Sequence, residues 1–353
     1  MKKRRVSKQI HIGQVRVGGG APIAVQSMTK TDTRDAKATI AQIKKLEECG
    51  CDIVRVAVPD REAAAALVKI VKSVSIPVVA DIHFDYRLAL AALKAGADGL
   101  RLNPGNIRDK EQVRKVVAAA KARSIPIRIG VNAGSLPPGK PRELSTAGYM
   151  VEIALKQVRL LEDWDYDLIK IALKAFDVPT TIEAYRGIAG KTLYPLHIGI
   201  TEAGLPQTGL VRSAAGIGIL LYEGIGDTIR VSLSAPPQEE VIAGYEILKS
   251  LNLREHGPIL VSCPSCGRSE TDIVELARMV SNYLNNITEP LKVAVMGCMV
   301  NGPGEAKDAD VGIACGKGRG ALFRKGKVIR TVNESEFFQS LTREIESLVN
   351  QVY

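Results

Sequence analysis

The chain has 353 residues, of which 46% are hydrophobic and 24% charged, and its formal net charge is +10 at pH 7. This length favours two domains, and the sequence has neither an apolar run of the roughly 18 residues that a membrane span requires nor a secretory signal, so we expect a cytoplasmic protein. The positive charge favours anionic partners, whereas 4% aromatic residues are too few for a base-stacking platform.

Short β-branched runs alternate with amphipathic stretches of helical period over the first two thirds of the chain. A hairpin of residues 9–12 and 15–17 is predicted to precede eight strands at 23–27, 53–58, 78–82, 99–102, 127–131, 168–172, 196–200 and 228–233. Helices are predicted between them, for example at 36–48, 62–73, 86–95, 109–122 and 147–162. Strict alternation implies a parallel sheet covered by helices, and eight units of this length match a closed (β/α)8 TIM barrel, with an open doubly wound sheet as the alternative.

A different pattern follows the eighth unit. Residues 236–257 are predicted to form a linker with a short helix at 238–251. Strands are then expected at 259–262, 291–296, 311–314, 321–324 and 328–331, and helices at 271–285 and 335–349. The sequence therefore predicts a TIM-barrel domain at 1–235 and a smaller α+β domain at 258–353.

Basic side chains interrupt the predicted barrel strands, which should be almost wholly apolar because a parallel barrel buries both faces. They are Arg55, Arg101, Arg128, Lys170, Lys174 and Arg230. Polar residues gather near the carboxyl ends of the strands, where the active sites of such barrels form; these include Asn132, His197, Glu202 and Ser232. Convergent cations with amide and hydroxyl donors predict a site for a compact polyanion. Alternatively, some of the cations pair with carboxylates in a structural network.

Three of the six cysteines follow strands of the second domain. Cys263 and Cys266 lie just after the strand at 259–262, and Cys298 lies just after the strand at 291–296. Because strand ends in one sheet lie close together, these thiolates can converge on one inorganic centre, either zinc or an iron–sulfur cluster. Cys315 or Glu305 could supply a fourth ligand: softness favours the thiolate, and ligand exchange at an iron favours the carboxylate. The spacing alone does not decide between them.

The cysteine segments resemble a known family. GCMVNGPGEA at 297–306 and CPSCGR at 263–268 are similar to the cluster motifs of the 4-hydroxy-3-methylbut-2-enyl diphosphate synthases of the methylerythritol phosphate pathway, in their short bacterial form. Further matches cover essentially the whole chain, among them VQSMT at 25–29, ADIHF at 80–84, LRLNPGN at 100–106 and HIGITEAG at 197–204. One departure is the segment ALKAF at 172–176, where a serine or another polar residue is expected near the lysine.

This resemblance implies a reaction and a cofactor. It implies that 2-C-methyl-D-erythritol 2,4-cyclodiphosphate is opened and reductively dehydrated, with two electrons delivered through a [4Fe–4S] cluster from ferredoxin or flavodoxin. The implied cluster ligands are Cys263, Cys266, Cys298 and Glu305. It further implies a homodimer with composite active sites. Residues 316–320 and 324–327 are candidates for docking the electron donor, or else form a solvated basic hairpin.

The resemblance also implies roles for the barrel residues. The diphosphate would be held by Arg55, Arg101, Arg128, Lys174 and Ser232, with Arg230 belonging to the same set of cations. Asn132, His197 and Glu202 would stand near the carbon skeleton, with Glu202 as the acid/base.

Two other functions compete with this interpretation. One is a barrel aldolase or lyase with a structural zinc module, in which Lys170 or Lys174 forms a Schiff base. The other is a basic nucleic-acid-binding protein with a zinc ribbon, which needs a second Cys-x2-Cys pair that the sequence lacks.

Overall fold

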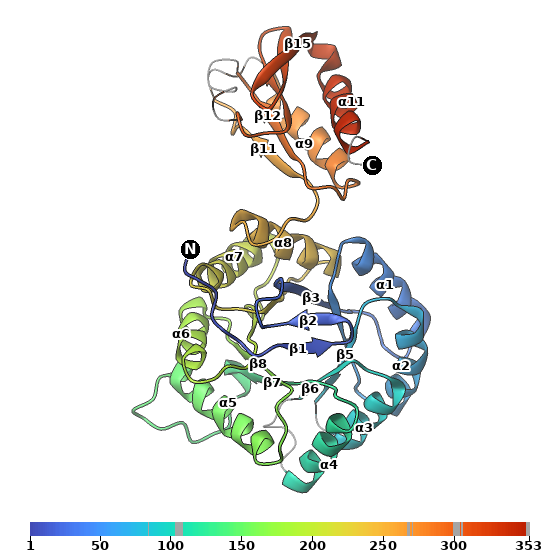
Figure 1. Cartoon of the computed structure of the whole chain (residues 1–353), viewed down its shortest axis with the longest axis vertical. Helices are drawn as coiled ribbons and strands as arrows, with labels where there is room; N and C mark the ends of the chain where they lie inside the picture. Colours follow the sequence, from blue (N-terminus) through green and yellow to red (C-terminus); the bar gives the residue numbers. More distant parts are fainter. Residues whose placement is uncertain are drawn as a thin grey trace. The chain divides into compact units, whose positions relative to one another are not determined.

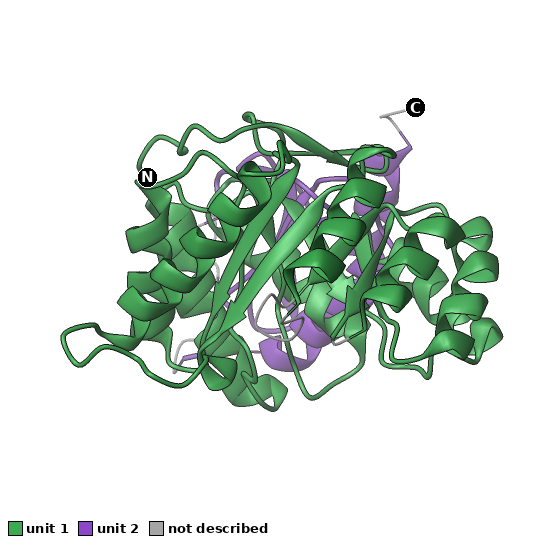
Figure 2. Ribbon diagram, turned by 90° about the horizontal axis from the view of Figure 1, so that it is seen from below, with its two compact units in different colours: residues 1–254 green, residues 255–353 purple. Residues whose placement is uncertain are grey.

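A computed structural model describes residues 1–83, 85–102, 109–266, 269, 271–298, 304 and 306–350. The chain divides into two compact units, Met1–Arg254 and Glu255–Tyr353 (Figure 2). No helix within the described ranges is long and apolar enough to cross a membrane.

Eight parallel strands form a barrel in the first unit, as the sequence predicts (Figure 1). They are β3 (Ala24–Met28), β4 (Ile53–Ala57), β5 (Val78–Ile82), β6 (Gly99–Leu102), β7 (Ile127–Asn132), β8 (Ile169–Lys174), β9 (His197–Ile198) and β10 (Thr228–Ile229). Hydrogen bonds order them β8-β7-β6-β5-β4-β3-β10-β9, and a parallel bridge between Ile171 and Leu196 joins the two ends of this sheet. The barrel is thus closed, which excludes the doubly wound alternative.

Helices surround this barrel (Figures 1 and 2). They are α1 (Ala36–Glu48), α2 (Arg61–Ser73), α3 (Tyr86–Ala95), α4 (Lys110–Lys121), α5 (Thr146–Glu162), α6 (Val178–Ala189), α7 (Pro206–Tyr222) and α8 (Pro237–Ser250), with a 3-10 turn at Ala133–Ser135. Most begin after a residue whose side chain accepts a first-turn N–H, as Asp60 does from Ala63 at 2.9 Å. Each packs an apolar face on the strands, as Leu67 and Ile70 of α2 do.

The amino-terminal hairpin covers one end of the barrel (Figure 1). It consists of β1 (Ile10–Ile12) and β2 (Val15–Val17), which pair antiparallel. Its buried apolar side chains pack against the first residues of neighbouring strands, including Ala24 and Ile53. Gly13, at a φ of +52°, makes the turn, where a Cβ would lie 2.9 Å from Cγ of Pro77. The hairpin therefore closes the amino-terminal end of the barrel.

Helix α8 belongs to the barrel and not to a linker. The sequence assigned residues 236–257 to a linker, but α8 packs against β3, α1 and α7, and buries Val241 and Leu248 completely. The boundary between the compact units accordingly falls between Arg254 and Glu255. The apolar face of α8 explains the difference, because a helix with such a face is stabilised by packing on the barrel.

The second unit is an α+β domain, as predicted. Its sheet has the order β11 (Ile259–Ser262), β12 (Lys292–Met296), β13 (Val311–Cys315), β14 (Arg319–Arg324) and β15 (Lys327–Asn333). The first three strands are parallel, whereas β14 and β15 are antiparallel to their neighbours. Helices α9 (Ile273–Leu284) and α11 (Phe337–Val349), the latter preceded by a 3-10 turn at Glu334–Glu336, pack on the sheet. Because β11 and β12 are parallel neighbours, the residues that follow them lie at the same edge.

Candidate active site

Basic side chains point into the barrel from successive strands. The strand register places Arg101 beside Arg128 and Arg128 beside Lys170, so these three cations form a row across β6, β7 and β8. Lys174 lies four residues nearer the carboxyl end of β8, opposite Asn132. All four cations are buried, with exposed fractions of 3 to 6%. Ionised groups without solvent are costly in such a strand, so this arrangement needs compensating partners.

Asp81 supplies a shared counter-ion on one side of the barrel. It accepts a hydrogen bond from Nη1 of Arg101 at 2.9 Å, and its other oxygen lies 3.4 Å from Nε of Arg55. Although burial by itself raises the pKa of this carboxyl, Arg55, a hydrogen bond from His83 and Arg101 lower it well below its usual range. Burial lowers the pKa of Arg55 to about 9, which leaves the guanidinium charged at neutral pH. Part of the alternative ion-pair network therefore exists.

Glu240 on α8 is a second buried counter-ion, which the sequence did not predict. Its side chain is 1% exposed and accepts hydrogen bonds from Oγ of Ser27 at 3.2 Å and from the backbone N–H of Leu233 at 3.0 Å. Nζ of Lys30 lies 2.9 Å away, and Nη2 of Arg230 lies 3.7 Å away. The sequence pattern does not predict Glu240 as a site residue, because it assigns the helix that carries Glu240 to a linker outside the barrel.

Several donors inside the barrel have no hydrogen-bond partner among the described residues. These atoms are Nε and Nη1 of Arg128, Nε of Arg101, Nε of Arg230, Nζ of Lys170 and Nε2 of His197. Burial, followed by the neighbouring cations, lowers the pKa of Arg128, Lys170 and Lys174 well below the usual values. Buried donors that lack acceptors are rare in proteins, so this cluster indicates a ligand rich in acceptor oxygens. A compact polyanion fits these donors.

His197 is completely buried beside these cations. Its Nδ1 lies 2.7 Å from Oγ1 of Thr228, its register partner on β10. Burial lowers its pKa well below the usual value, and the charges of Lys174, Arg128 and Lys170 lower it further. The imidazole is therefore neutral at pH 7, with Nε2 available to a ligand.

Asn132 and Glu202 line one cavity of about 450 Å³ at the carboxyl ends of the strands, together with Thr201, Phe176 and Asp177. Glu202 is exposed and has a φ of +55°, a left-handed conformation that is uncommon for a residue other than glycine. Such an outlier is often found at a functional position. Ser232 is half-buried and lies two residues beyond Arg230. The structure thus brings Asn132 and Glu202 together at the barrel mouth.

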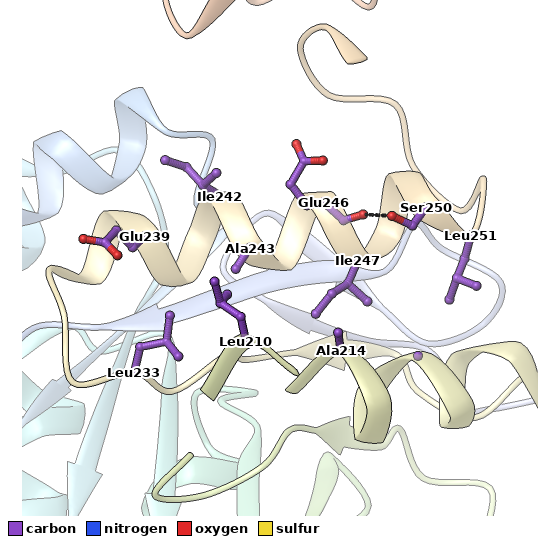
Figure 3. Close-up of a pocket in the computed structure, with 11 residues that line it drawn as sticks. Leu210, Ala214, Leu233, Glu239, Ile242, Ala243, Glu246, Ile247, Ser250 and Leu251 are labelled. Atoms are coloured by element: carbon purple, nitrogen blue, oxygen red, sulfur yellow. Dashed lines mark hydrogen bonds between the residues drawn. The ribbon is translucent and has the colours of Figure 1, made fainter. Parts of the chain in front are cut away.

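A larger cavity of about 530 Å³ lies elsewhere, between α7 and α8 (Figure 3). Leu210 and Ala214 of α7 face Ile247 of α8 across it. None of the barrel cations lines this cavity, and its walls are mostly aliphatic. Its chemistry does not suit a polyanion.

In the second unit, the predicted cysteine ligands lie at the edge formed by the ends of β11 and β12. The backbone N–H of Gly297, next to Cys298, donates to Sγ of Cys263 at 3.1 Å. Cys266 is exposed, and Glu305 lies outside the described residues. Within the described part of the chain, no three Cys, His, Asp or Glu side chains lie close enough to hold a metal ion. Thiolates that receive backbone N–H groups are suitable ligands for an iron–sulfur cluster.

Cys315, the other candidate for the fourth ligand, lies at the end of β13. Its side chain is completely buried, and burial raises the pKa of its thiol to about 12. It packs in the core between the sheet and the helices, as a small apolar residue would.

Comparisons with known proteins cover both units. The family model of the GcpE TIM-barrel domain matches residues 7–245, and that of the GcpE protein C-terminal domain matches residues 259–347. The chain is 67% identical over 345 residues to the 4-hydroxy-3-methylbut-2-en-1-yl diphosphate synthase (flavodoxin) of Dehalococcoides mccartyi (strain CBDB1), covering 98% of this chain and 99% of that protein. A protein of the same name from Thermodesulfovibrio yellowstonii is 57% identical over 347 residues, with coverages of 98% and 99%.

Solved structures show the same barrel. Dihydropteroate synthase from Xanthomonas albilineans, in complex with 7,8-dihydropteroate, superposes with a TM-score of 0.52 at 15% sequence identity. The match covers 70% of this chain and 98% of that one. At this identity the likeness concerns the fold alone.

Proposed function

The chain belongs to the GcpE family, and we propose that it catalyses the reductive ring opening and dehydration of 2-C-methyl-D-erythritol 2,4-cyclodiphosphate. The product is 4-hydroxy-3-methylbut-2-enyl diphosphate, an intermediate of non-mevalonate isoprenoid biosynthesis, and the enzyme is an oxidoreductase. Membership of this family argues against the aldolase and nucleic-acid interpretations. The observation that carries the proposal is the cluster of buried cationic donors without partners inside the barrel.

These donors would bind the diphosphate. The proposed contacts are Arg55, Arg101, Arg128, Lys174, Arg230 and Ser232. Asp81 and Glu240 fix the arginines beside them, so the guanidinium groups need little reorganisation when the substrate arrives. When the C–O bond to the diphosphate breaks, negative charge develops on the leaving oxygen. Cations that are already in place stabilise that charge, so the same residues would bind the substrate and promote ring opening.

The loss of a hydroxyl as water needs a proton. Glu202 lines the cavity at the barrel mouth beside Asn132, and we assign it the role of the acid that protonates the departing oxygen. The amide of Asn132 would orient the carbon skeleton. His197 is neutral, and its Nε2 has no partner among the described residues, so we assign it a hydrogen bond to the substrate through that nitrogen.

Cys263, Cys266, Cys298 and Glu305 would hold a [4Fe–4S] cluster, which when bound supplies single electrons and a Lewis-acidic iron. The hydrogen bond from Gly297 to Cys263 supports this ligand set, because N–H donors stabilise thiolate charge. The complete burial of Cys315 favours Glu305 as the fourth ligand.

Electrons would come from flavodoxin or ferredoxin in the cytoplasm. The relatives carry flavodoxin in their names, which supports the first. We also propose a homodimer with composite active sites, in which the barrel of one chain works with the cluster domain of the other. Mixed dimers of an Arg128→Met chain and a Cys298→Ser chain should then be active although each variant alone is inactive. No activity in the mixed dimers would contradict composite sites.

Anaerobic turnover tests the function itself. Reconstituted protein, reduced flavodoxin and the cyclodiphosphate should give the allylic diphosphate, detected by mass spectrometry. Arg128→Met should abolish this product, whereas Lys156→Met on the exposed face of α5 should not. Absence of product from iron-loaded wild-type protein would refute the assignment.

A further inference from the structure

Lys170 is a buried basic residue that the proposed mechanism leaves without a role. Its side chain is 3% exposed, and its Nζ has no hydrogen-bond partner among the described residues. A buried amine without a hydrogen-bond partner is unfavourable whether or not it is charged, so an accidental position is not expected. The residue therefore needs either a structural partner or a ligand.

The register places Lys170 in the substrate-facing row. It lies directly beside Arg128 on the neighbouring strand, and Arg128 lies beside Arg101. Toward the carboxyl ends of the strands, the next register pair on the same face is Gly130 and Ala172, the two smallest kinds of residue. A Cβ on Gly130 would lie 3.3 Å from Nε of Arg101, so that arginine extends over this gap. The small residues of this pair leave space on the same face of the sheet between Lys170 and the carboxyl ends of the strands.

A structural role for Lys170 would require a nearby carboxylate as its partner. Asp227 is the candidate, because it is the acidic group that acts on the pKa of Lys170. That carboxylate already accepts hydrogen bonds from Oγ of Ser7 at 2.7 Å and from the backbone N–H of Leu196 at 2.8 Å. Arg4 and Arg5 lie 3.6 and 3.7 Å from it. Asp227 is thus occupied by the amino-terminal segment, and it makes no ion pair with Lys170.

Resting on the proposed function, we propose that Lys170 is a further diphosphate-binding residue, and that the barrel takes up a proton there when the anion binds. The charged groups that face Lys170 are Arg128 of β7, Arg55 of β4 and Asp227 before β10, and the neutral imidazole of His197 on β9 also faces it. Burial and the two arginines lower the pKa of Lys170 well below its usual value. A bound anion would reverse this effect, because it favours the charged amine.

Calorimetric titration of inorganic pyrophosphate into the full-length protein tests the inference. Titration in two buffers with different enthalpies of ionisation gives the number of protons taken up on binding. Lys170→Met should bind pyrophosphate at least tenfold more weakly and take up fewer protons than the wild type. The same variant should melt no lower than the wild type without ligand, because the substitution removes a buried amine. Lys156→Met, in the exposed surface of α5, is the matched control and should behave as wild type.

A second variant guards against misfolding. Lys170→Gln keeps much of the length of the side chain without its charge and should weaken binding to a similar degree. Wild-type affinity and proton uptake in either folded variant would overturn the inference, as would a loss of stability with binding unchanged, which would mark a structural residue. If wild-type protein itself fails to bind pyrophosphate and the cyclodiphosphate, the proposed function fails instead.

Discussion

Replacing Asp81 by Asn removes the carboxylate that the buried Arg101 shares with the half-buried Arg55. Its oxygens lie 2.9 Å from Nη1 of Arg101 and 3.4 Å from Nε of Arg55, and its exposed fraction is 2%. Removing one partner of a buried ion pair costs about 3–5 kcal/mol, because the remaining charge stays buried. For a unit of this size each kcal/mol lowers the melting temperature by about 2–4 °C, so we expect a fall of about 6–20 °C.

A bound anion should partly reverse this loss. Pyrophosphate compensates the charge of Arg55 and Arg101, and a ligand that binds only the folded state stabilises it. The melting temperatures of Asp81→Asn and the wild type, measured by circular dichroism, should therefore differ less with pyrophosphate than without it. A fall below about 2 °C for a unit of this size would show that Asp81 is not the counter-ion that we describe. If the difference in melting temperature is the same with and without pyrophosphate, Asp81 stabilises the fold but does not neighbour the anion-binding site.

The same carboxylate makes the stability depend on pH. Its pKa in the folded protein is lowered, so its contribution is fully present above the value of the unfolded chain, about 4, and is lost as the pH falls toward the folded value. Urea unfolding should therefore show a difference between Asp81→Asn and the wild type that is constant above about pH 5 and shrinks below about pH 4. A difference that grows in acid would contradict this sign.

Three further results are expected. Cys298→Ser should lose iron on anaerobic reconstitution, measured by elemental analysis, whereas Cys315→Ser should keep it; iron loss in the second variant would reassign the fourth ligand. Glu202→Gln should bind the cyclodiphosphate normally but turn over about 100-fold more slowly in steady-state assays, and near-normal turnover would remove it from the acid role. Gly199→Ala should lower both the melting temperature and the affinity for pyrophosphate, because its Cβ would lie 2.3 Å from the carbonyl oxygen of Arg230; unchanged values would show that the strands can separate freely.

Local patterns predicted much of the fold. The helices at 36–48 and 86–95 and the strands at 78–82, 99–102 and 259–262 have the predicted bounds. Strand β9 was predicted too long, since regular pairing ends where Gly199 packs closely on Arg230. Helix α8 was placed outside the barrel because its proline-rich start resembles a domain end. Both differences depend on tertiary packing, which local periodicity does not contain.

The candidate site was predicted unevenly for a similar reason. Charged residues within apolar strands are visible in the sequence, and Arg101, Arg128 and Lys174 indeed lie inside the barrel. Their counter-ions are less visible, because Asp81 comes from another strand and Glu240 from a helix. Pairing between distant segments sets which cations are compensated, and that information appears only in three dimensions.

The hairpin of β1 and β2 covers the amino-terminal end of the barrel, so the interior opens only at the carboxyl-terminal end. If the diphosphate binds inside this barrel as we propose, the water that it displaces has to leave past it, and the product has to depart through the same opening by which the substrate entered. Turnover inside one barrel is therefore sequential, since a lingering product occludes the passage for the next molecule. The hairpin also separates the barrel arginines from bulk solvent at the amino-terminal end. An anion can therefore approach these arginines only from the carboxyl-terminal end.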